Sequence, residues 1–183
     1  MKAITYFLLT VSVALFAFDQ HANKTFIRQN ISLINQEKER VKSYSCLSQT
    51  DAEKVLGQTA KLTESSSENK NGIKKYRCTY TANIIDTKTN KTGNLYYLLE
   101  EYKNVNSSQV VYSDILKQNE NMPGLKKLNK IGDQAFLHTD NKNFLIIISR
   151  KGNKIVRLKV NKLTSMTSLN ELQNISKAIT EKL

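Results

Sequence analysis

The sequence predicts an α+β domain in which helices pack on an antiparallel β-sheet. Residues 75–82 alternate between apolar and polar side chains, which is typical of a half-buried strand. Residues 144–150 and 154–162 flank Gly152-Asn153, a pattern that favours a β-hairpin with a type II′ turn. Near the end of the chain, apolar residues recur at helical spacing, at Leu169, Leu172, Ile175, Ile179 and Leu183. Strands and amphipathic helices in one short chain indicate the α+β class.

The first half of the domain is expected to contain one short helix and two strands. The capping-box pattern from Thr50 to Glu53 predicts the helix start, and Gly57 predicts its end. Residues 65–72 are rich in Ser, Asn and Gly and are interpreted as a turn cluster. Strand 75–82 is then expected to continue through a flexible loop at 86–93 into a second strand at 94–102.

The second half is expected to repeat the order of a helix followed by strands. A helix should begin at Ser107 and end at Pro123-Gly124, and a third strand should form around residues 131–136. The hairpin that follows would set Ile148 opposite Arg157 and Ile146 opposite Lys159. Residues 144–148 are apolar on both faces, as in a central strand covered on both sides. A second capping box, Ser168 to Glu171, predicts the start of the closing helix.

The N-terminal segment is expected to direct export. Lys2 is followed by a predominantly apolar run at 4–18, which is typical of a secretory signal peptide. As a helix this run rises only about 22 Å, less than the hydrocarbon core, so a retained membrane anchor is the weaker alternative. We therefore expect a signal peptide at 1–22, a charged helical spacer at 23–45 and a single α+β domain at 46–183. The expected location is the periplasm or the exterior of a bacterium, with no transmembrane span after processing.

Cys46 and Cys78 are the only cysteines, and they are expected to form a disulfide. An even pair in an exported protein meets an oxidising environment. Cys78 lies on the inward face of strand 75–82, and Cys46 precedes the helix that should pack on that face. A redox-active pair and a metal site are the alternatives, but the spacing matches neither Cys-x-x-Cys nor a Cys/His cluster.

Several short motifs resemble small exported bacterial domains with the PsbP-like fold, many of them uncharacterised lipoproteins. They are Cys46, the stretch 51–57 (DAEKVLG), Cys78-x-Tyr80, the stretch 131–136 (IGDQAF) and the turn 150–153 (RKGN) before a final helix. The resemblance covers residues 46–183 and implies an α/β/α sandwich and a non-enzymatic binding or accessory role. It also implies the Cys46–Cys78 pairing. This chain departs from the lipoproteins in lacking a lipidation cysteine near the leader.

The charge balance suggests an acidic partner. Lys and Arg number 28 against 16 Asp and Glu, a formal net charge of +12, which attracts polyanions. The hairpin carries the candidate surface for an anionic partner, comprising Arg150, Lys151, Lys154, Arg157 and Lys159. An acidic protein or an anionic envelope component is the expected partner, and a merely solvated lysine surface is the alternative. Aromatic residues do not alternate with these cations, so the stacking platform of a single-strand nucleic-acid binder is missing and no sequence-specific nucleic-acid binding is expected.

The sequence offers no catalytic, cofactor or metal signature. His138, Glu100 and Asp133 are the residues from which an enzyme site would have to be assembled. Glu100 and Glu101 should face opposite sides of a strand, and Asp133 is interpreted as the cap of its own turn. We therefore expect an exported, non-catalytic binding or accessory protein that acts through a basic surface. The alternatives are an immunity or inhibitor protein against an exported toxin, or a small-substrate enzyme. The oligomeric state stays open.

Overall fold

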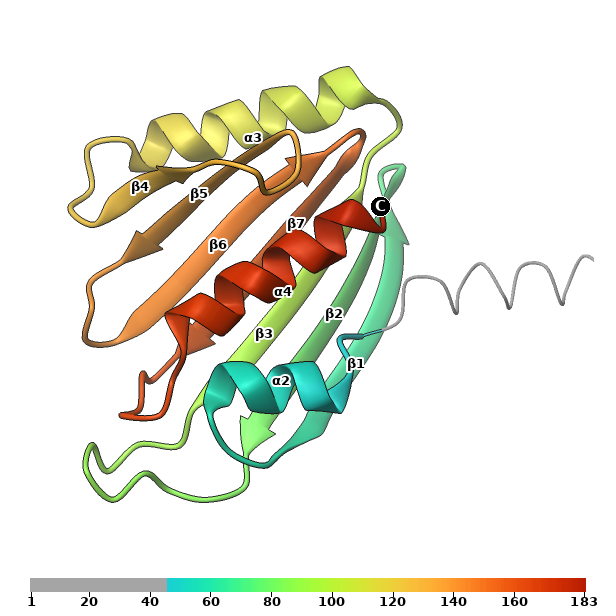
Figure 1. Ribbon diagram of the computed structural model, residues 1–183. Coiled ribbons are helices and arrows are strands. Elements are labelled where there is room, and N and C mark those ends of the chain that lie inside the picture. The colour runs from blue at the N-terminus through green and yellow to red at the C-terminus, as the bar shows by residue number, and fades with distance from the viewer. Residues whose placement is uncertain (1–45) are drawn as a thin grey trace, which may run out of the picture. The chain divides into compact units, whose positions relative to one another are not determined.

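A computed structural model describes residues 46–183, which form a compact unit of their own (Figure 1). The predicted signal peptide at 1–22 and the spacer at 23–45 lie outside the described residues. The elements are α2 (Gln49–Leu56), β1 (Ala60–Lys70), β2 (Ile73–Ala82), β3 (Asn94–Glu101), α3 (Val105–Asn119), β4 (Leu125–Leu128), β5 (Gln134–Thr139), β6 (Phe144–Lys151), β7 (Lys154–Asn161) and α4 (Leu169–Glu181). Their order confirms the predicted succession of helix, strands, helix, strands and helix.

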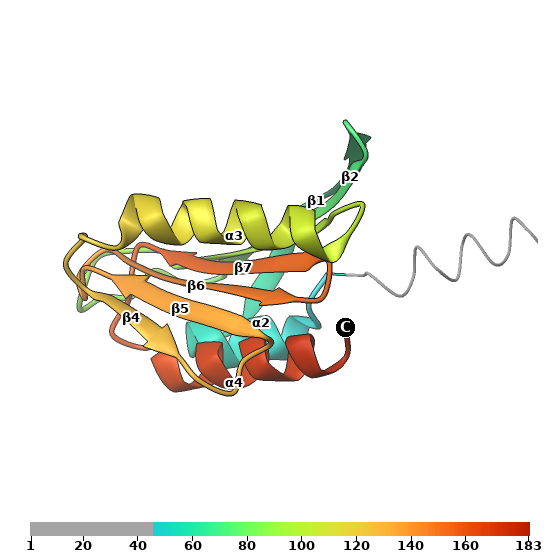
Figure 2. The same cartoon turned by 90° about the horizontal axis from the view of Figure 1, so that it is seen from above.

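The strands form one seven-stranded antiparallel sheet in the order β1-β2-β3-β7-β6-β5-β4. The pairing of β3 with β7 joins the first three strands to the last four. The helices cover both faces, with α2 and α4 on one side and α3 on the other (Figure 2). We call these sides the α2/α4 face and the α3 face. The predicted α+β class with helices packed on an antiparallel sheet is confirmed.

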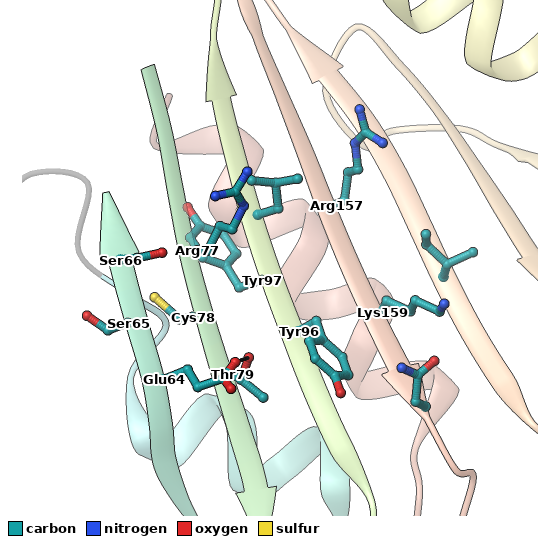
Figure 3. Close-up of a pocket in the computed structure, with 13 residues that line it drawn as sticks. Glu64, Ser65, Ser66, Arg77, Cys78, Thr79, Tyr96, Tyr97, Arg157 and Lys159 are labelled. Carbon is teal, nitrogen blue, oxygen red and sulfur yellow. Dashed lines mark hydrogen bonds between the residues drawn. The ribbon is translucent and has the colours of Figure 1, made fainter. Parts of the chain in front are cut away.

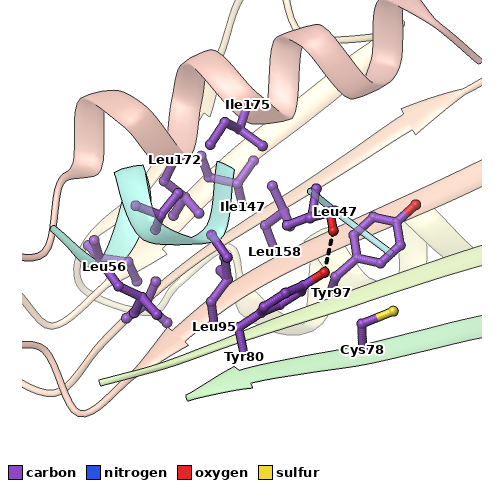
Figure 4. Close-up of a cluster of buried hydrophobic side chains, with 14 of the residues drawn as sticks. Leu47, Leu56, Cys78, Tyr80, Leu95, Tyr97, Ile147, Leu158, Leu172 and Ile175 are labelled. Carbon is purple, nitrogen blue, oxygen red and sulfur yellow. Dashed lines mark hydrogen bonds between the residues drawn. The ribbon is translucent and has the colours of Figure 1, made fainter. Parts of the chain in front are cut away.

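The main apolar core lies between the sheet and the helices α2 and α4. It gathers side chains that alternate along β2, β3, β6 and β7, among them Leu95, Ile147 and Leu158, with Leu56 and Leu172 from the two helices (Figure 4). A smaller cluster under α3 contains Tyr112, Phe136 and Ile148. Each strand therefore presents its alternate residues to two different environments.

The predicted hairpin is confirmed in register and in turn. Ile148 lies opposite Arg157, and Ile146 lies opposite Lys159. Gly152 has a positive φ of 55° and Asn153 does not have a positive φ, as a type II′ turn requires at its two positions. Ile147 is buried on the α2/α4 face and Ile148 on the α3 face, so β6 is covered on both sides as expected.

Two strands were not predicted from the sequence. Residues 65–70 belong to β1, so their assignment to a turn cluster was wrong, and only Asn71-Gly72 turns between β1 and β2. Every residue of β1 after Ala60 is exposed, because β1 is an edge strand and the helices leave most of it uncovered. A strand that is polar on both faces carries no alternation to detect. The other edge, β4, is only four residues long and carries Lys126 and Lys127.

The helix starts differ in part from the predicted caps. Ser48, not Thr50, caps α2, since its Oγ accepts a hydrogen bond from the Asp51 amide at 3.0 Å. Helix α3 begins at Val105 rather than at the predicted Ser107, and Asn104 caps it, with its Oδ1 accepting from the Ser107 amide at 2.8 Å. Ser, Thr and Asn all favour the N-cap position, so the sequence alone does not show which of several nearby candidates immediately precedes the helix.

The remaining helix signals are confirmed. Gly57 ends α2 with φ 69°, and the Met166 carbonyl oxygen lies too close to Gly57 to leave room for a Cβ. Ser168 caps α4, with its Oγ accepting from the Glu171 amide at 3.2 Å. The amide of Ser168 itself donates to the Val55 carbonyl at 2.9 Å, so this hydrogen bond ties the start of α4 to α2.

The predicted disulfide between Cys46 and Cys78 is present, with a Cα–Cα distance of 5.7 Å. The Tyr80 hydroxyl donates to the Leu47 carbonyl beside it (Figure 4). These two links fasten the segment before α2 to β2 on the α2/α4 face. Within residues 46–183, no helix combines the length and apolar character needed to cross a bilayer.

Candidate functional site

The α3 face is only partly covered, and its open part forms a groove. Helix α3 contacts β6 and β7, which leaves β1 and much of β2 and β3 uncovered on that side. The groove has a volume of about 760 Å³ (Figure 3). Its lining comprises Glu64, Ser65, Ser66, Arg77, Cys78, Thr79, Tyr96, Tyr97, Leu98, Ile146, Arg157, Lys159 and Asn161.

Strand alternation arranges the groove floor in two cross-strand rows. The first row runs from Arg77 on β2 through Leu98 on β3 to Arg157 on β7. The second runs from Thr79 through Tyr96 to Lys159. Each row is continued on β6 by an isoleucine, Ile148 in the first and Ile146 in the second. The floor therefore combines cationic groups with an apolar centre (Figure 3).

A buried carboxylate fixes the position of Arg157. Glu100 is only 3% exposed, yet its Oε2 accepts from the Arg157 Nη2 at 2.7 Å and its Oε1 lies 3.2 Å from the Lys75 Nζ. Beside this pair, burial raises the pKa of Tyr102 to about 12, and the charge of Glu100 adds to the rise. A carboxylate buried this deeply needs both cations, because an unpaired buried charge is costly.

The cations of the groove retain unused binding capacity. The Arg157 side chain is partly exposed in the groove, although its Nε is buried and has no hydrogen-bond partner among residues 46–183. Lys159 forms no ion pair within the described chain, and its Nζ lies 5.8 Å from the centre of the Phe144 ring. Arg77 pairs with Glu68 at 2.8 Å, but both side chains are exposed, and such a pair exchanges readily for another carboxylate.

The five predicted surface residues are divided between two places. Arg157 and Lys159 line the groove. Arg150 and Lys151 lie at the turn between β6 and β7, where both pair with Asp133, at 3.3 and 3.1 Å. Arg150 is nearly buried and also donates to Gln134 and to the Gly152 carbonyl. Lys154 lies at the same turn, opposite Lys151.

The three residues considered for catalysis have separate partners. Glu100 binds Lys75 and Arg157, His138 packs edge-on against Phe144 at 5.1 Å, and none of the three lines the groove. Asp133 does not cap its own turn, as the sequence suggested, because its Oδ2 accepts from the Gly152 amide at 2.8 Å on the facing turn. In the described part of the chain, no three His, Cys, Asp or Glu side chains are placed to hold a metal ion.

Sequence reasoning missed the contribution of β2 and β3 to the site. Alternation along 75–82 already placed Arg77 and Thr79 on one face, opposite Cys78 and Tyr80. The pairing of β3 with β7 is what brings them to Arg157 and Lys159. This pairing joins strands more than fifty residues apart, so no local pattern could reveal it.

Comparisons with protein-family models, with curated proteins and with solved structures found no match to this chain. The groove and its charges therefore provide the basis for inferring a function. The resemblance to PsbP-like domains stays a prediction.

Proposed function

We propose that this protein is an exported, non-catalytic binding domain that holds an acidic segment of a partner protein in the groove on the α3 face. The observation that carries the proposal is the pair Arg157 and Lys159, neighbours on the groove floor, of which Lys159 forms no ion pair within the described residues. Arg157 is held in place by Glu100, so its guanidinium is positioned before a ligand arrives. Preorganised donors lose little conformational freedom on binding.

The chemistry of the floor favours a protein segment over other anions. Tyr96, Leu98 and Ile146 lie between or beside the cations, so a ligand must supply apolar groups as well as carboxylates. Arg groups suit carboxylates because they donate in a fixed planar geometry. Tyr96 is the one aromatic side chain on the floor, since Tyr97 belongs to the opposite face, and a single ring is a poor stacking platform for nucleic acid.

Other features are consistent with this proposal. The Cys46–Cys78 disulfide fits an oxidising compartment, in agreement with the leader that the sequence predicts at 1–22. Characterised members of the PsbP-like group, which the sequence resembles, are mostly binding or accessory proteins. Periplasmic or extracellular location and a PsbP-like relationship are therefore part of the proposal.

A defined peptide tests the proposal directly. A fluorescent peptide that alternates glutamate and leucine should bind residues 44–183 at low ionic strength, whereas a lysine–leucine peptide of equal length should not. The variant Arg77→Glu/Lys159→Glu should weaken binding at least tenfold, because it reverses two floor charges without breaking the Glu100 pair. Lys126→Glu/Lys127→Glu makes the same charge change at the far edge strand and serves as the matched control.

Peptide binding by the two double variants distinguishes specific binding in the groove from non-specific attraction to a basic surface. Equal losses in the two double variants would show that only net charge matters, and the groove would then have no special role. A capture experiment with the same three proteins, using extracts of the cell envelope, should recover an acidic partner with the wild type and the control only.

A further inference from the structure

The loop between β2 and β3 presents two adjacent isoleucines to solvent. Ile84 is 63% exposed and Ile85 is 56% exposed, the two highest values among the large apolar side chains in residues 46–183. The loop lies at the end of the sheet opposite the β6–β7 turn (Figure 1). Scattered apolar residues are normal on a surface, but two neighbours at the tip of a loop call for a physical reason.

The loop that carries them is fixed by a buried charge. Asp86 is 4% exposed, and its carboxylate accepts from the Ser165 amide at 2.7 Å, the Ser165 hydroxyl at 3.0 Å and the Thr89 hydroxyl at 2.7 Å. The Lys88 amide donates to it at 3.1 Å. On the other side of the isoleucines, the Asn83 amide donates to the Thr59 carbonyl at 3.0 Å. Ile84 and Ile85 are thus held outward between two anchored residues.

Met166 belongs to the same apolar tip. It follows Ser165, which is bound to Asp86, and it is 39% exposed. The close contact of its carbonyl with Gly57 fixes this segment against the end of α2. We call Ile84, Ile85 and Met166 the apolar tip.

Lysines surround the apolar tip without acidic partners. Lys88 and Lys91 lie in the same loop, and the Lys91 Nζ donates to the Lys142 carbonyl at 3.1 Å, which joins the β5–β6 loop to it. Lys162 adjoins Gly93 at the end of the loop. None of these four lysines forms an ion pair within the described residues.

The carboxylates at this end are already engaged. Asp86 binds Ser165 and Thr89, and Asp140 accepts from the amides of Lys142 and Asn143 and from the Asn143 side chain. Because these hydrogen-bond donors are neutral, the two carboxylates keep their negative charges, and four lysines against two aspartates leave this end of the sheet with a small excess of positive charge beside the apolar tip.

We propose that this end of the domain docks on an anionic lipid surface, with the apolar tip inserted among the headgroups and the four lysines above them. Lipid binding of this kind combines a small buried apolar area with attraction between lysines and anionic headgroups. Three side chains on a loop tip are too few for a stable protein interface, which usually buries more than about 1,000 Å². The surface is separate from the groove, so the two proposals fail independently.

Vesicle sedimentation tests the docking with residues 44–183, the compact unit without the apolar leader. The unit should sediment with phosphatidylcholine vesicles that contain phosphatidylglycerol and stay in solution with phosphatidylcholine alone. Ile84→Ser/Ile85→Ser should weaken binding at least tenfold, and Lys88→Glu/Lys91→Glu should weaken it about as much. Val105→Ser/Val110→Ser removes two side chains of α3 that are each 51% exposed, and it should bind like the wild type.

A fluorescence reporter makes the test independent of folding losses. The chain contains no tryptophan, so Ile84→Trp adds a single emitter at the tip. Its emission should shift to the blue on phosphatidylglycerol vesicles and be quenched by brominated lipid, whereas Val105→Trp should show neither change.

Three results would overturn the proposal. The first is sedimentation that Ile84→Ser/Ile85→Ser leaves unchanged, because binding would then be electrostatic only. The second is fluorescence of the Ile84→Trp variant that vesicles do not alter. The third is a dimer in solution that Ile84→Ser/Ile85→Ser dissociates without any vesicle binding, which would assign the tip to a second copy of the chain.

Discussion

The two faces of the sheet are built from the same strands but have different chemistry. On the α2/α4 face, Leu56, Leu95 and Leu158 are fully buried in a continuous apolar core sealed by two helices. On the α3 face, the smaller cluster around Phe136 gives way to the buried charge of Glu100 and then to an open groove. On β7, Leu158 faces the core, while Arg157 and Lys159 on either side of it face the groove.

This difference indicates that, within one strand, the residues on one face stabilise the fold while those on the other face are available for binding. The closed face supplies most of the apolar burial that stabilises the fold. The open face can then carry partly exposed cations and an exposed tyrosine, which would be costly in a sealed core. Substitutions at neighbouring positions of one strand should therefore have very different effects.

The largest difference is expected between Leu158 and Lys159. Leu158→Ala should lower the free energy of unfolding by about 3–5 kcal/mol, because it leaves a cavity in a fully buried site. Lys159→Ala, one residue along on the other face, should change it by less than about 0.5 kcal/mol. Urea unfolding followed by circular dichroism measures both. Similar losses would mean that the groove residues also hold the fold together.

The disulfide should come next, since it fastens the closed face. Cys46→Ala/Cys78→Ala should lower the free energy of unfolding by about 2–4 kcal/mol, as expected for a closed loop of this length. Reductant should destabilise the wild type by a similar amount and leave the double variant unchanged. Unfolding curves with and without dithiothreitol provide the check, and a wild type that reductant leaves unchanged would contradict the assignment.

The buried pair on the α3 face should have an intermediate effect. Arg157→Gln leaves Glu100 with Lys75 alone and should cost about 1–3 kcal/mol, because part of a buried charge loses its partner. Arg77→Gln on the neighbouring strand breaks the exposed pair with Glu68 and should cost less than about 1 kcal/mol. Chemical denaturation of the two variants compares them, and equal values would show that Lys75 alone compensates the charge of Glu100.

The closed face could be predicted well from the sequence, and the open face could not. Alternation along 75–82 and 144–150 and the helical spacing from Leu169 onward result from burial, which leaves a strong local pattern. Strand β1 was missed because all of its residues after Ala60 are exposed, and nearly all are polar. Its place in the sheet depends on backbone pairing with β2, which requires no particular side chains.

The candidate site was predicted only in part for a related reason. The hairpin register correctly placed Arg157 and Lys159 on one face with Ile146 and Ile148. Arg150 and Lys151 lie on the same hairpin, but their pairing with Asp133 depends on the turn before β5 folding against the hairpin. Glu100 likewise reaches Arg157 only through the pairing of β3 with β7. Long-range pairing decides which charges are neutralised.

The stability that Asp86 contributes at the end of the sheet should depend on pH. Hydrogen bonds, first from the Ser165 amide and then from Thr89, lower the pKa of Asp86 from 3.8 to about 2. A lowered pKa in the folded state contributes stability that is complete above about pH 4 and is lost as the pH falls toward 2. The stability difference between the wild type and Asp86→Asn should therefore shrink over this range. Urea midpoints at a series of pH values measure it, and a constant difference would contradict the assigned role.

The smallest effect is expected at the start of α2, one of the helices that seal the closed face. The Ser48 side chain satisfies the Asp51 amide, so Ser48→Ala should cost about 1 kcal/mol. Thr50 lies within the helix and is exposed, so Thr50→Ala should have almost no effect. Thermal unfolding should separate the two variants by several degrees. The opposite order would show that Thr50 caps the helix, as the sequence suggested. Equal small effects would show that the disulfide at Cys46 and the Tyr80–Leu47 hydrogen bond hold α2 in place without its cap.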